Sequence, residues 1–260
     1  MLIIQSIVPK TAEEIRRIAR AGKIVAGCHK ALVGKCVPGI TTAAIDRFID
    51  WYMVEHGAYP AQKGHKGYPY ASCISVNEVA CHGFPSSYKL EKGDIVTIDI
   101  VADYKGWKAD SAWTYMVGEV SPQARRLVRA AKAAFRVGLA QAVIGNDISD
   151  IGYAIEQRAQ RDGFQVITSF LGHGIGKELH ELPHVHHVRT RTSGIKLEEG
   201  MVITIEPILS TGSPEIYIAH DGWTARTIDH ALTAQFEHTI AITKAGPKIL
   251  TRLTKVKKQR

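Results

Sequence analysis

The sequence predicts an α+β fold made of two halves related by a pseudo-twofold axis. In each half, two helix-like segments precede strand-like segments, and marker residues recur at a nearly constant offset. The stretch LEKGDIVTIDI at 90–100 also resembles LEEGMVITIEP at 197–207, and each has one carboxylate near its end, Asp99 or Glu206. Because there are only two copies, the repeat indicates an internal duplication, not a solenoid. The matched positions are Gly39 and Gly145, Ile45 and Ile151, and Gly57 and Gly163, each 106 residues apart, and Gly93 and Gly200, 107 apart.

Length and composition are those of one globular domain over 1–260, with halves at about 1–120 and 121–255 and a basic tail at 251–260. Hydrophobic residues make up 45% of the chain, and no apolar run approaches the roughly 20 residues that span a bilayer. The first residues lack the basic start of a secretory signal. The four cysteines form no C-x-x-C pair, so we expect buried free thiols in a reducing cytoplasm.

Two helices are expected in the first half. The segment 11–34 begins with Thr11 and has Glu14 three residues later, which is the pattern of a capping box. Apolar residues then recur at helical spacing. The second helix covers 41–57 and is ended by Gly57.

The second half repeats this order. A helix over 121–143 has Ser121 as its cap and Pro122 at its first position. The next helix covers 149–163 and is ended by Gly163.

The chain is basic, with a formal net charge of +8 and a pI of about 9.3. Basic residues gather at 124–136 and 255–260. We interpret them as a solvated helix face and a solvated tail. Contact with an anionic surface such as ribosomal RNA is the alternative.

The segment 94–118 is expected to form a hairpin with its turn at 103–106. In the simplest register Asp99 faces Asp110, with Cβ atoms roughly 4.5–5.5 Å apart. Two bare carboxylates at that distance repel each other, and burial increases the cost. Either they share a proton or a cation lies between them.

The second half adds Glu206 and Glu237 in strand-like runs, and His173 between glycines in LGHGIGK. Together with the hairpin pair, these are four carboxylates and one imidazole. Two divalent cations would balance four negative charges, and this ligand set suits Mn, Fe, Co or Zn. Metals roughly 3.5–4 Å apart can share a water and lower its pKa. The sequence therefore predicts a dinuclear metal site.

Nearly end to end, the sequence resembles the type I methionine aminopeptidases. The resemblance implies the pita-bread (creatinase/aminopeptidase) fold, an antiparallel sheet with helices on the outside. It is carried by YPYASCISVNEVACHGFP (68–85), GHGIGKELHELPHV (172–185), TIEP (204–207), DGWTARTIDHALTAQFEHTI (221–240) and the Asp99/Asp110 pair. Without an amino-terminal extension, the chain is similar to the short bacterial form.

The resemblance also implies roles. A hydroxide bridging the metals would attack the first carbonyl, with Glu206 as general base. His180 would stabilise the developing oxyanion, and His82 would contact the scissile nitrogen. By the same resemblance, one metal would be held by Asp110, His173, Glu206 and Glu237, and the other by Asp99, Asp110 and Glu237.

For the methionine side chain, the resemblance implies an apolar pocket of Tyr68, Cys73, Leu179 and Trp223. Soft and aromatic surfaces pack well against a thioether. Position 179 is commonly aromatic in the bacterial family. His65 and Gln62 stand where many relatives carry tyrosine and cysteine, so the shape of this pocket is left open.

The stretch HELPH at 180–184 matches the zincin pattern H-E-x-x-H, which requires a continuous helix. Pro183 is incompatible with such a helix, so we reject that interpretation. The nearby histidines His184, His186 and His187 are expected in a solvated loop.

The resemblance implies a cytoplasmic, metal-dependent aminopeptidase that removes the initiator methionine of nascent chains and prefers a small second residue. We expect a monomer that binds neither DNA nor membrane. Two alternatives stay open: a Xaa-Pro aminopeptidase or prolidase of the same fold, and a non-catalytic protein that binds RNA or ribosomes.

Overall fold

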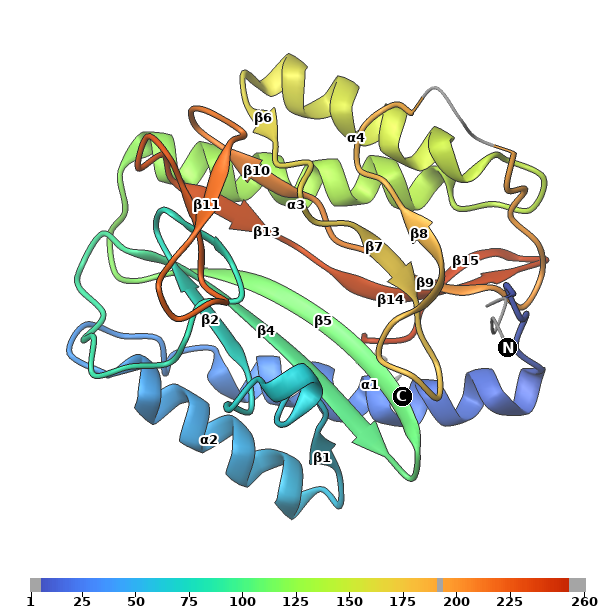
Figure 1. The fold of residues 1–260 in the computed structure, drawn as a ribbon, viewed down its shortest axis with the longest axis horizontal. Helices are drawn as coiled ribbons and strands as arrows, with labels where there is room; N and C mark the ends of the chain where they lie inside the picture. The colour runs from blue at the N-terminus through green and yellow to red at the C-terminus, as the bar shows by residue number, and fades with distance from the viewer. Residues whose placement is uncertain (1–5, 191–193, 253–260) are drawn as a thin grey trace, which may run out of the picture.

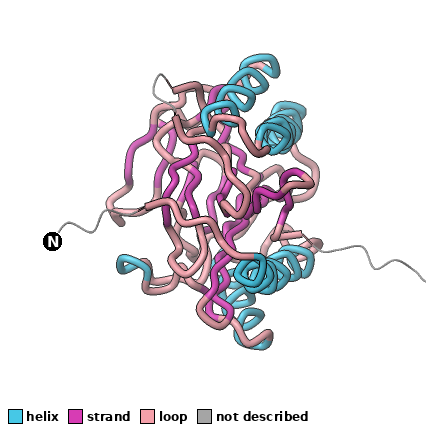
Figure 2. The backbone as a smooth tube through the Cα atoms, turned by 90° about the vertical axis from the view of Figure 1, so that its right-hand side faces the viewer, coloured by secondary structure: helices cyan, strands magenta, loops and turns pink. Residues whose placement is uncertain are grey.

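The computed structural model describes residues 6–190 and 194–252, and over this part of the chain it has four α-helices and fifteen strands. Helices α1 and α2 lie on one side of the strands, and α3 and α4 lie on the opposite side (Figure 1). The view turned by 90° shows the helices at the outside and strands through the interior (Figure 2). The predicted arrangement of antiparallel strands with outer helices is confirmed.

The first two helices begin where their capping residues predict. Helix α1 covers Ala12–Leu32, and the capping box between Thr11 and Glu14 is formed. Helix α2 covers Thr42–Glu55 and is capped by the Thr41 side chain.

The second helix pair follows the same rules. Helix α3 covers Pro122–Gln141, and the Ser121 side chain accepts a hydrogen bond from the N–H of Ala124. Helix α4 covers Ile148–Asp162 and ends at Gly163, whose φ of 81° is left-handed and suits glycine.

The first half carries a four-stranded sheet in which β4 pairs with β1, β2 and β5, all antiparallel. Its strands are β1 (Tyr59–Pro60), β2 (Cys73–Val76), β4 (Ile95–Tyr104) and β5 (Trp107–Met116); a short 3₁₀ turn, η1, covers His65–Gly67.

The second half carries a five-stranded sheet in the order β15-β14-β9-β7-β8. Its strands are β7 (Gly172–Gly174), β8 (Glu181–Val185), β9 (Val202–Ile205), β14 (His238–Thr243) and β15 (Gly246–Ile249). Two three-stranded sheets, β13-β10-β6 and β11-β12-β3, complete the fold. They consist of β3 (Val79–Cys81), β6 (Gln165–Val166), β10 (Ile208–Ser210), β11 (Ile216–Ile218), β12 (Ala225–Thr227) and β13 (Thr233–Gln235).

Each half is built mainly around one hydrophobic core, to which a few residues of the other half contribute. One core packs α1 and α2 against β4, and the other packs α3 and α4 against β9 and β14. The halves meet at β5, where the N–H of Glu237 donates to the carbonyl of Ala112 at 2.8 Å. A β-bridge also joins Trp113 to Phe236. The strands that carry the predicted acids therefore lie at the junction of the halves.

The register of the β4–β5 hairpin differs from the prediction. Asp99 lies opposite Ala112, and Asp110 lies opposite Val101, so the two acids are not directly paired. The cause is a two-residue turn at Lys105 and Gly106, where both φ angles are positive (55° and 79°). The acids are offset by two residues and keep the same face of the sheet, because side chains alternate with a period of two.

All four cysteines are free and buried, as predicted. In the part of the chain that the structure describes, no helix is long and apolar enough to cross a membrane. The basic segment 255–260 lies outside the described residues.

Candidate metal centre

Glu206 and Glu237 are the second pair of acids, and they lie between two strand pairs that have the same register. Strands β9 and β14 pair up to Ile205 and His238, and β10 and β13 continue from Ile208 and Gln235. This common register puts Glu206 opposite Glu237. The ladder is interrupted between its two parts because Pro207 has no N–H to donate.

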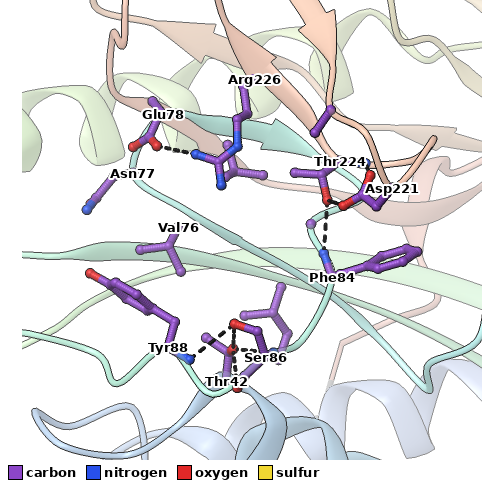
Figure 3. Close-up of a pocket in the computed structure, with 14 residues that line it drawn as sticks. Thr42, Val76, Asn77, Glu78, Phe84, Ser86, Tyr88, Asp221, Thr224 and Arg226 are labelled. Atoms are coloured by element: carbon purple, nitrogen blue, oxygen red, sulfur yellow. Dashed lines mark hydrogen bonds and ion pairs between the residues drawn. The ribbon is translucent and has the colours of Figure 1, made fainter.

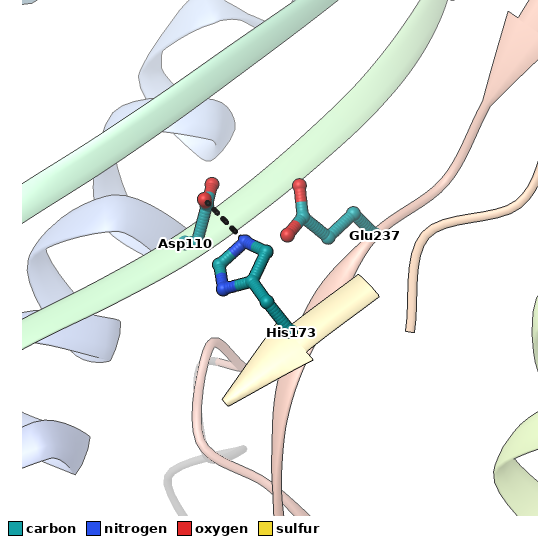
Figure 4. Close-up of side chains that lie close together, drawn as sticks. All are labelled: Asp110, His173 and Glu237. Carbon is teal, nitrogen blue, oxygen red and sulfur yellow. Dashed lines mark ion pairs between the residues drawn. The ribbon is translucent and has the colours of Figure 1, made fainter. Parts of the chain in front are cut away.

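Acids from both halves and one histidine come together at the junction. Asp110, His173 and Glu237 each offer a ligand atom, and these atoms lie within 4.8 Å of one another (Figure 4). The Nε2 atom of His173 lies 3.9 Å from Oδ2 of Asp110 and 3.6 Å from Oε1 of Glu206. Asp99 belongs to the same group because its carboxyl interacts directly with that of Asp110.

Several of these oxygens have no partner. Oδ1 of Asp99, Oδ1 of Asp110 and Oε1 of Glu237 are buried, and no hydrogen bond reaches them from the described residues. A buried carboxylate without a partner costs several kcal/mol. The donor set therefore fits divalent cations, which supply positive charge to all of these oxygens at once.

The acids raise each other's pKa values. Burial raises the pKa of Asp99 to about 6, and burial with repulsion from Asp99 raises that of Glu206 to about 8. Burial and the neighbouring carboxylates hold the pKa values of Asp110 and Glu237 well above their ordinary range. Four acids that resist ionisation together are typical of a site that becomes fully charged only with metal present.

His173 is prepared to act as a metal ligand. Its Nδ1 lies 2.9 Å from the carbonyl oxygen of Gly174, and that oxygen can only accept. The proton is therefore on Nδ1, and the lone pair of Nε2 faces the acids. Burial lowers the pKa of His173 to about 4, which keeps the ring neutral.

Two threonines hold the ligands in place, and the sequence analysis did not identify them. The hydroxyl of Thr204 donates to Oε1 of Glu206 at 2.6 Å and accepts from the N–H of His173 at 2.9 Å. The hydroxyl of Thr239 bonds to the backbone N–H and carbonyl of Asp110. The sequence contained a signal for Thr204, since the similar stretches VTID and ITIE both carry a threonine two residues before the acid.

The prediction of a solvated loop is wrong for His187. Its side chain is only 3% exposed, and Nε2 accepts the N–H of Glu206 at 3.1 Å. Burial lowers its pKa to about 3, so the ring remains a neutral acceptor. His184 and His186 are exposed, in agreement with the prediction, although His184 lies in β8. The strand also confirms that HELPH is not a helix.

The two histidines with predicted catalytic roles have different neighbours. The ring of His180 packs edge-on against that of His173, with centroids 4.4 Å apart. His82 has a left-handed φ of 53°, an uncommon value for a residue other than glycine. Its ring contacts Trp223 and Phe170. Burial, with smaller electrostatic contributions from nearby groups including His173 and His82, lowers the pKa of His180 to about 3.

Among the residues of the predicted side-chain pocket, Cys73 lies beside one of the acids. Cys73 lies opposite Asp99 in the β2–β4 ladder and is buried. Tyr68 packs edge-on against Trp223 at 5.1 Å. Leu179 is buried in the hydrophobic core of the first half.

The two departures from the family pattern reach the same region. The side-chain amide of Gln62 donates to Sγ of Cys73 at 3.4 Å, and its oxygen accepts the N–H of Val101. The ring of His65 lies 5.2 Å from that of His180, and its Nε2 is buried without a partner among the described residues. Polar groups therefore stand beside a pocket that was expected to be apolar.

A separate hollow of about 420 Å³ lies on the other face of β2 (Figure 3). Ile74 and Val76 line it, whereas Cys73 points toward the acids. Arg226 and Glu78 form an ion pair at its edge (Figure 3). None of the five predicted metal ligands is among its lining residues.

The fold and this cluster define a metal-dependent hydrolase with the pita-bread fold. The model of Metallopeptidase family M24 matches residues 16–244, and the chain belongs to that family. A curated relative, the methionine aminopeptidase of Clostridium perfringens, is 42% identical over 245 residues, covering 94% of this chain and 98% of the relative.

Solved structures agree with this assignment. The methionine aminopeptidase from Thermotoga maritima superposes with a TM-score of 0.93 at 38% identity, covering 95% of this chain and 100% of that one. The prolidase from Pyrococcus furiosus is more distant, with a TM-score of 0.77 and 25% identity, and this chain covers 66% of it.

Proposed function

We propose that the protein is a methionine aminopeptidase that removes the initiator methionine from new chains and prefers a small second residue. The observation that supports this most is the cluster of four acids, of which Asp110 and Glu237 are buried, around one neutral imidazole. This cluster lies in a chain that is similar to enzymes of that name over nearly its full length. The acids coming from both halves explain why the whole fold is needed for one site.

Asp110, His173, Glu206 and Glu237 would hold one divalent ion, and Asp99, Asp110 and Glu237 would hold a second. Manganese, iron, cobalt and zinc all suit this mixture of oxygen and imidazole ligands. When bound, such ions would polarise the scissile carbonyl and lower the pKa of a water between them.

The surrounding side chains would move protons and orient the substrate. Glu206 would act as general base, because bound metal would keep its carboxylate ionised and able to accept a proton. Neutral His180 would donate a hydrogen bond to the oxyanion that develops on the carbonyl. His82 would contact the scissile nitrogen. The methionine side chain would lie among Tyr68, Cys73, Leu179 and Trp223.

The decisive experiment is hydrolysis of Met-Ala-Ser against a Xaa-Pro dipeptide by protein loaded with one metal at a time under anaerobic conditions. Release of methionine from the first peptide supports the proposal. Cleavage of the Xaa-Pro peptide alone would assign the chain to the prolidase side of the family. Asp99→Asn serves as the inactive control, and Glu119→Gln, at an acid whose side chain is 77% exposed, should retain activity.

We also propose that the protein works as a monomer in a reducing cytoplasm, because all four of its thiols are free. Exposed basic residues on α3 favour brief contact with ribosomal RNA while nascent chains are processed. Tight RNA binding without any metal-dependent turnover would instead favour a non-catalytic role.

A further inference from the structure

A second hollow lies between α1 and α3 on the opposite face of the strands that carry the acids. Its volume is about 500 Å³, within the usual range for pockets that bind small molecules. Its apolar floor includes Trp113, Phe135 and Phe236, and we call it the back pocket. Because side chains alternate along β5, Trp113 faces the back pocket while Asp110 faces the acid cluster.

The rim of the back pocket is strongly basic. Lys30, Lys132, Arg136 and Arg252 line it and are exposed, and no acidic residue is among the lining residues. Over residues 6–190 and 194–252, none of these four side chains forms an ion pair. The rim therefore gathers four cations without a counter-charge around one apolar floor.

The floor also contains a polar group that can still donate a hydrogen bond. The Nε1–H of Trp113 is buried and has no hydrogen-bond partner among the described residues. Leaving such a donor unpaired costs about 1–3 kcal/mol. Nδ1 of His238 is occupied by the hydroxyl of Thr251 at 2.9 Å, and burial lowers the pKa of this ring to about 4, so it adds no charge.

We propose that the back pocket binds a small amphiphilic anion, with an apolar body on the aromatic floor and a phosphate or carboxylate head among the basic rim. Burying the apolar floor and the ligand's apolar body away from water favours binding. The head pairs with cations that form no ion pair within the described residues, although Lys132 also lies over the Phe236 ring, 5.5 Å from its centroid. The chain's own segment 253–260 follows directly on Arg252, but its sequence LTKVKKQR is basic and would add like charge.

The test is calorimetric titration of the metal-loaded full-length protein with decyl phosphate, decanoate, decanol and decyltrimethylammonium, each below its micelle concentration. Decyl phosphate and decanoate should bind at least about tenfold more tightly than decanol, and the cation should not bind. Comparison of the two anions tells a phosphate head from a carboxylate head. Equal affinity for decanol would overturn the proposal.

The double variant Lys132→Glu/Arg136→Glu should weaken decyl phosphate binding by about tenfold or more. Both side chains are exposed, so folding is retained, and thermal melting checks this. The matched control is Arg129→Glu, on the same helix but outside the back pocket, which should change affinity less than twofold. Equal loss in the control would indicate a diffuse surface for polyanions and would contradict a pocket.

Removal of residues 253–260 gives an independent measurement. Affinity for decyl phosphate should stay within about twofold, since the proposed occupant comes from solution. A gain of tenfold or more would identify the tail as the occupant and refute the proposal. Methionine release is the internal reference throughout, because it depends on the opposite face of β5 and reports separately on the proposed function.

Discussion

In the metal-free protein, replacing Glu206 by glutamine should make stability less sensitive to pH. The carboxyl has an ordinary pKa of 4.5 and a folded-state pKa of about 8, because burial and Asp99 oppose its charge. A raised acid pKa means that the folded state holds the proton more tightly than the unfolded state. Stability is therefore highest at low pH and is lost as the pH rises from about 4.5 through 8.

The magnitude follows from the size of that shift. Integrated between pH 5 and 8, this one group lowers the free energy of unfolding by about 3 kcal/mol. Glutamine removes the titration and leaves the local contact intact, since its amide oxygen can still accept from the hydroxyl of Thr204. The variant should therefore lose about 3 kcal/mol less than the wild type over this range.

Urea unfolding followed by circular dichroism in chelator, at pH 5, 6, 7 and 8, measures the difference. The control is Glu119→Gln, at an acid whose side chain is 77% exposed, and its profile should run parallel to the wild type. Saturating manganese should reverse the order at pH 8, because bound metal stabilises the charged acids. Parallel profiles for wild type and Glu206→Gln without metal would refute the electrostatic argument.

Three further predictions concern the same site. Asp99→Asn should abolish methionine release while the metal-free protein melts no lower than the wild type, as activity and thermal denaturation would show; retained turnover would exclude Asp99 as a ligand. His187→Ala should leave the N–H of Glu206 unpaired, cost about 1–3 kcal/mol in urea unfolding and weaken metal binding, whereas His186→Ala at the exposed neighbour should do neither. Thr204→Val should raise the pKa of Glu206 further, since the hydroxyl stabilises the charged form, and should move the acidic limb of the pH–rate profile upward; an unchanged profile would count against Glu206 as the base.

Sequence patterns predicted the helices and the donor set because both depend on local or repeated chemistry. Thr11 and Ser121 can cap helices from their own side chains, whatever the rest of the fold does. Asp99 and Glu206 occupy matching positions in two similar stretches, and this predicted two similar strands without knowledge of the strand pairing. Both predictions needed only the order of residues along the chain.

The hairpin register was missed for a definite reason. The turn at 103–106 was placed one residue too early, because Lys105 adopts a left-handed φ that its residue type does not announce. The error moved the predicted partner of Asp99 from Ala112 to Asp110. It left the conclusion intact because a shift of two residues returns the side chain to the same face.

By itself, the sequence predicted two similar halves, a set of acids and one histidine able to bind cations, and the positions where the helices begin. Only the tertiary structure decided which partners orient them: the neutral ring of His187 behind Glu206, the hydroxyl of Thr204 between His173 and Glu206, and the unpaired cations over the back pocket. Apart from the contact between Thr204 and Glu206, these contacts join residues far apart in the chain. Such contacts form only when the fold brings the side chains within a few ångströms of each other, and the local sequence does not specify those distances.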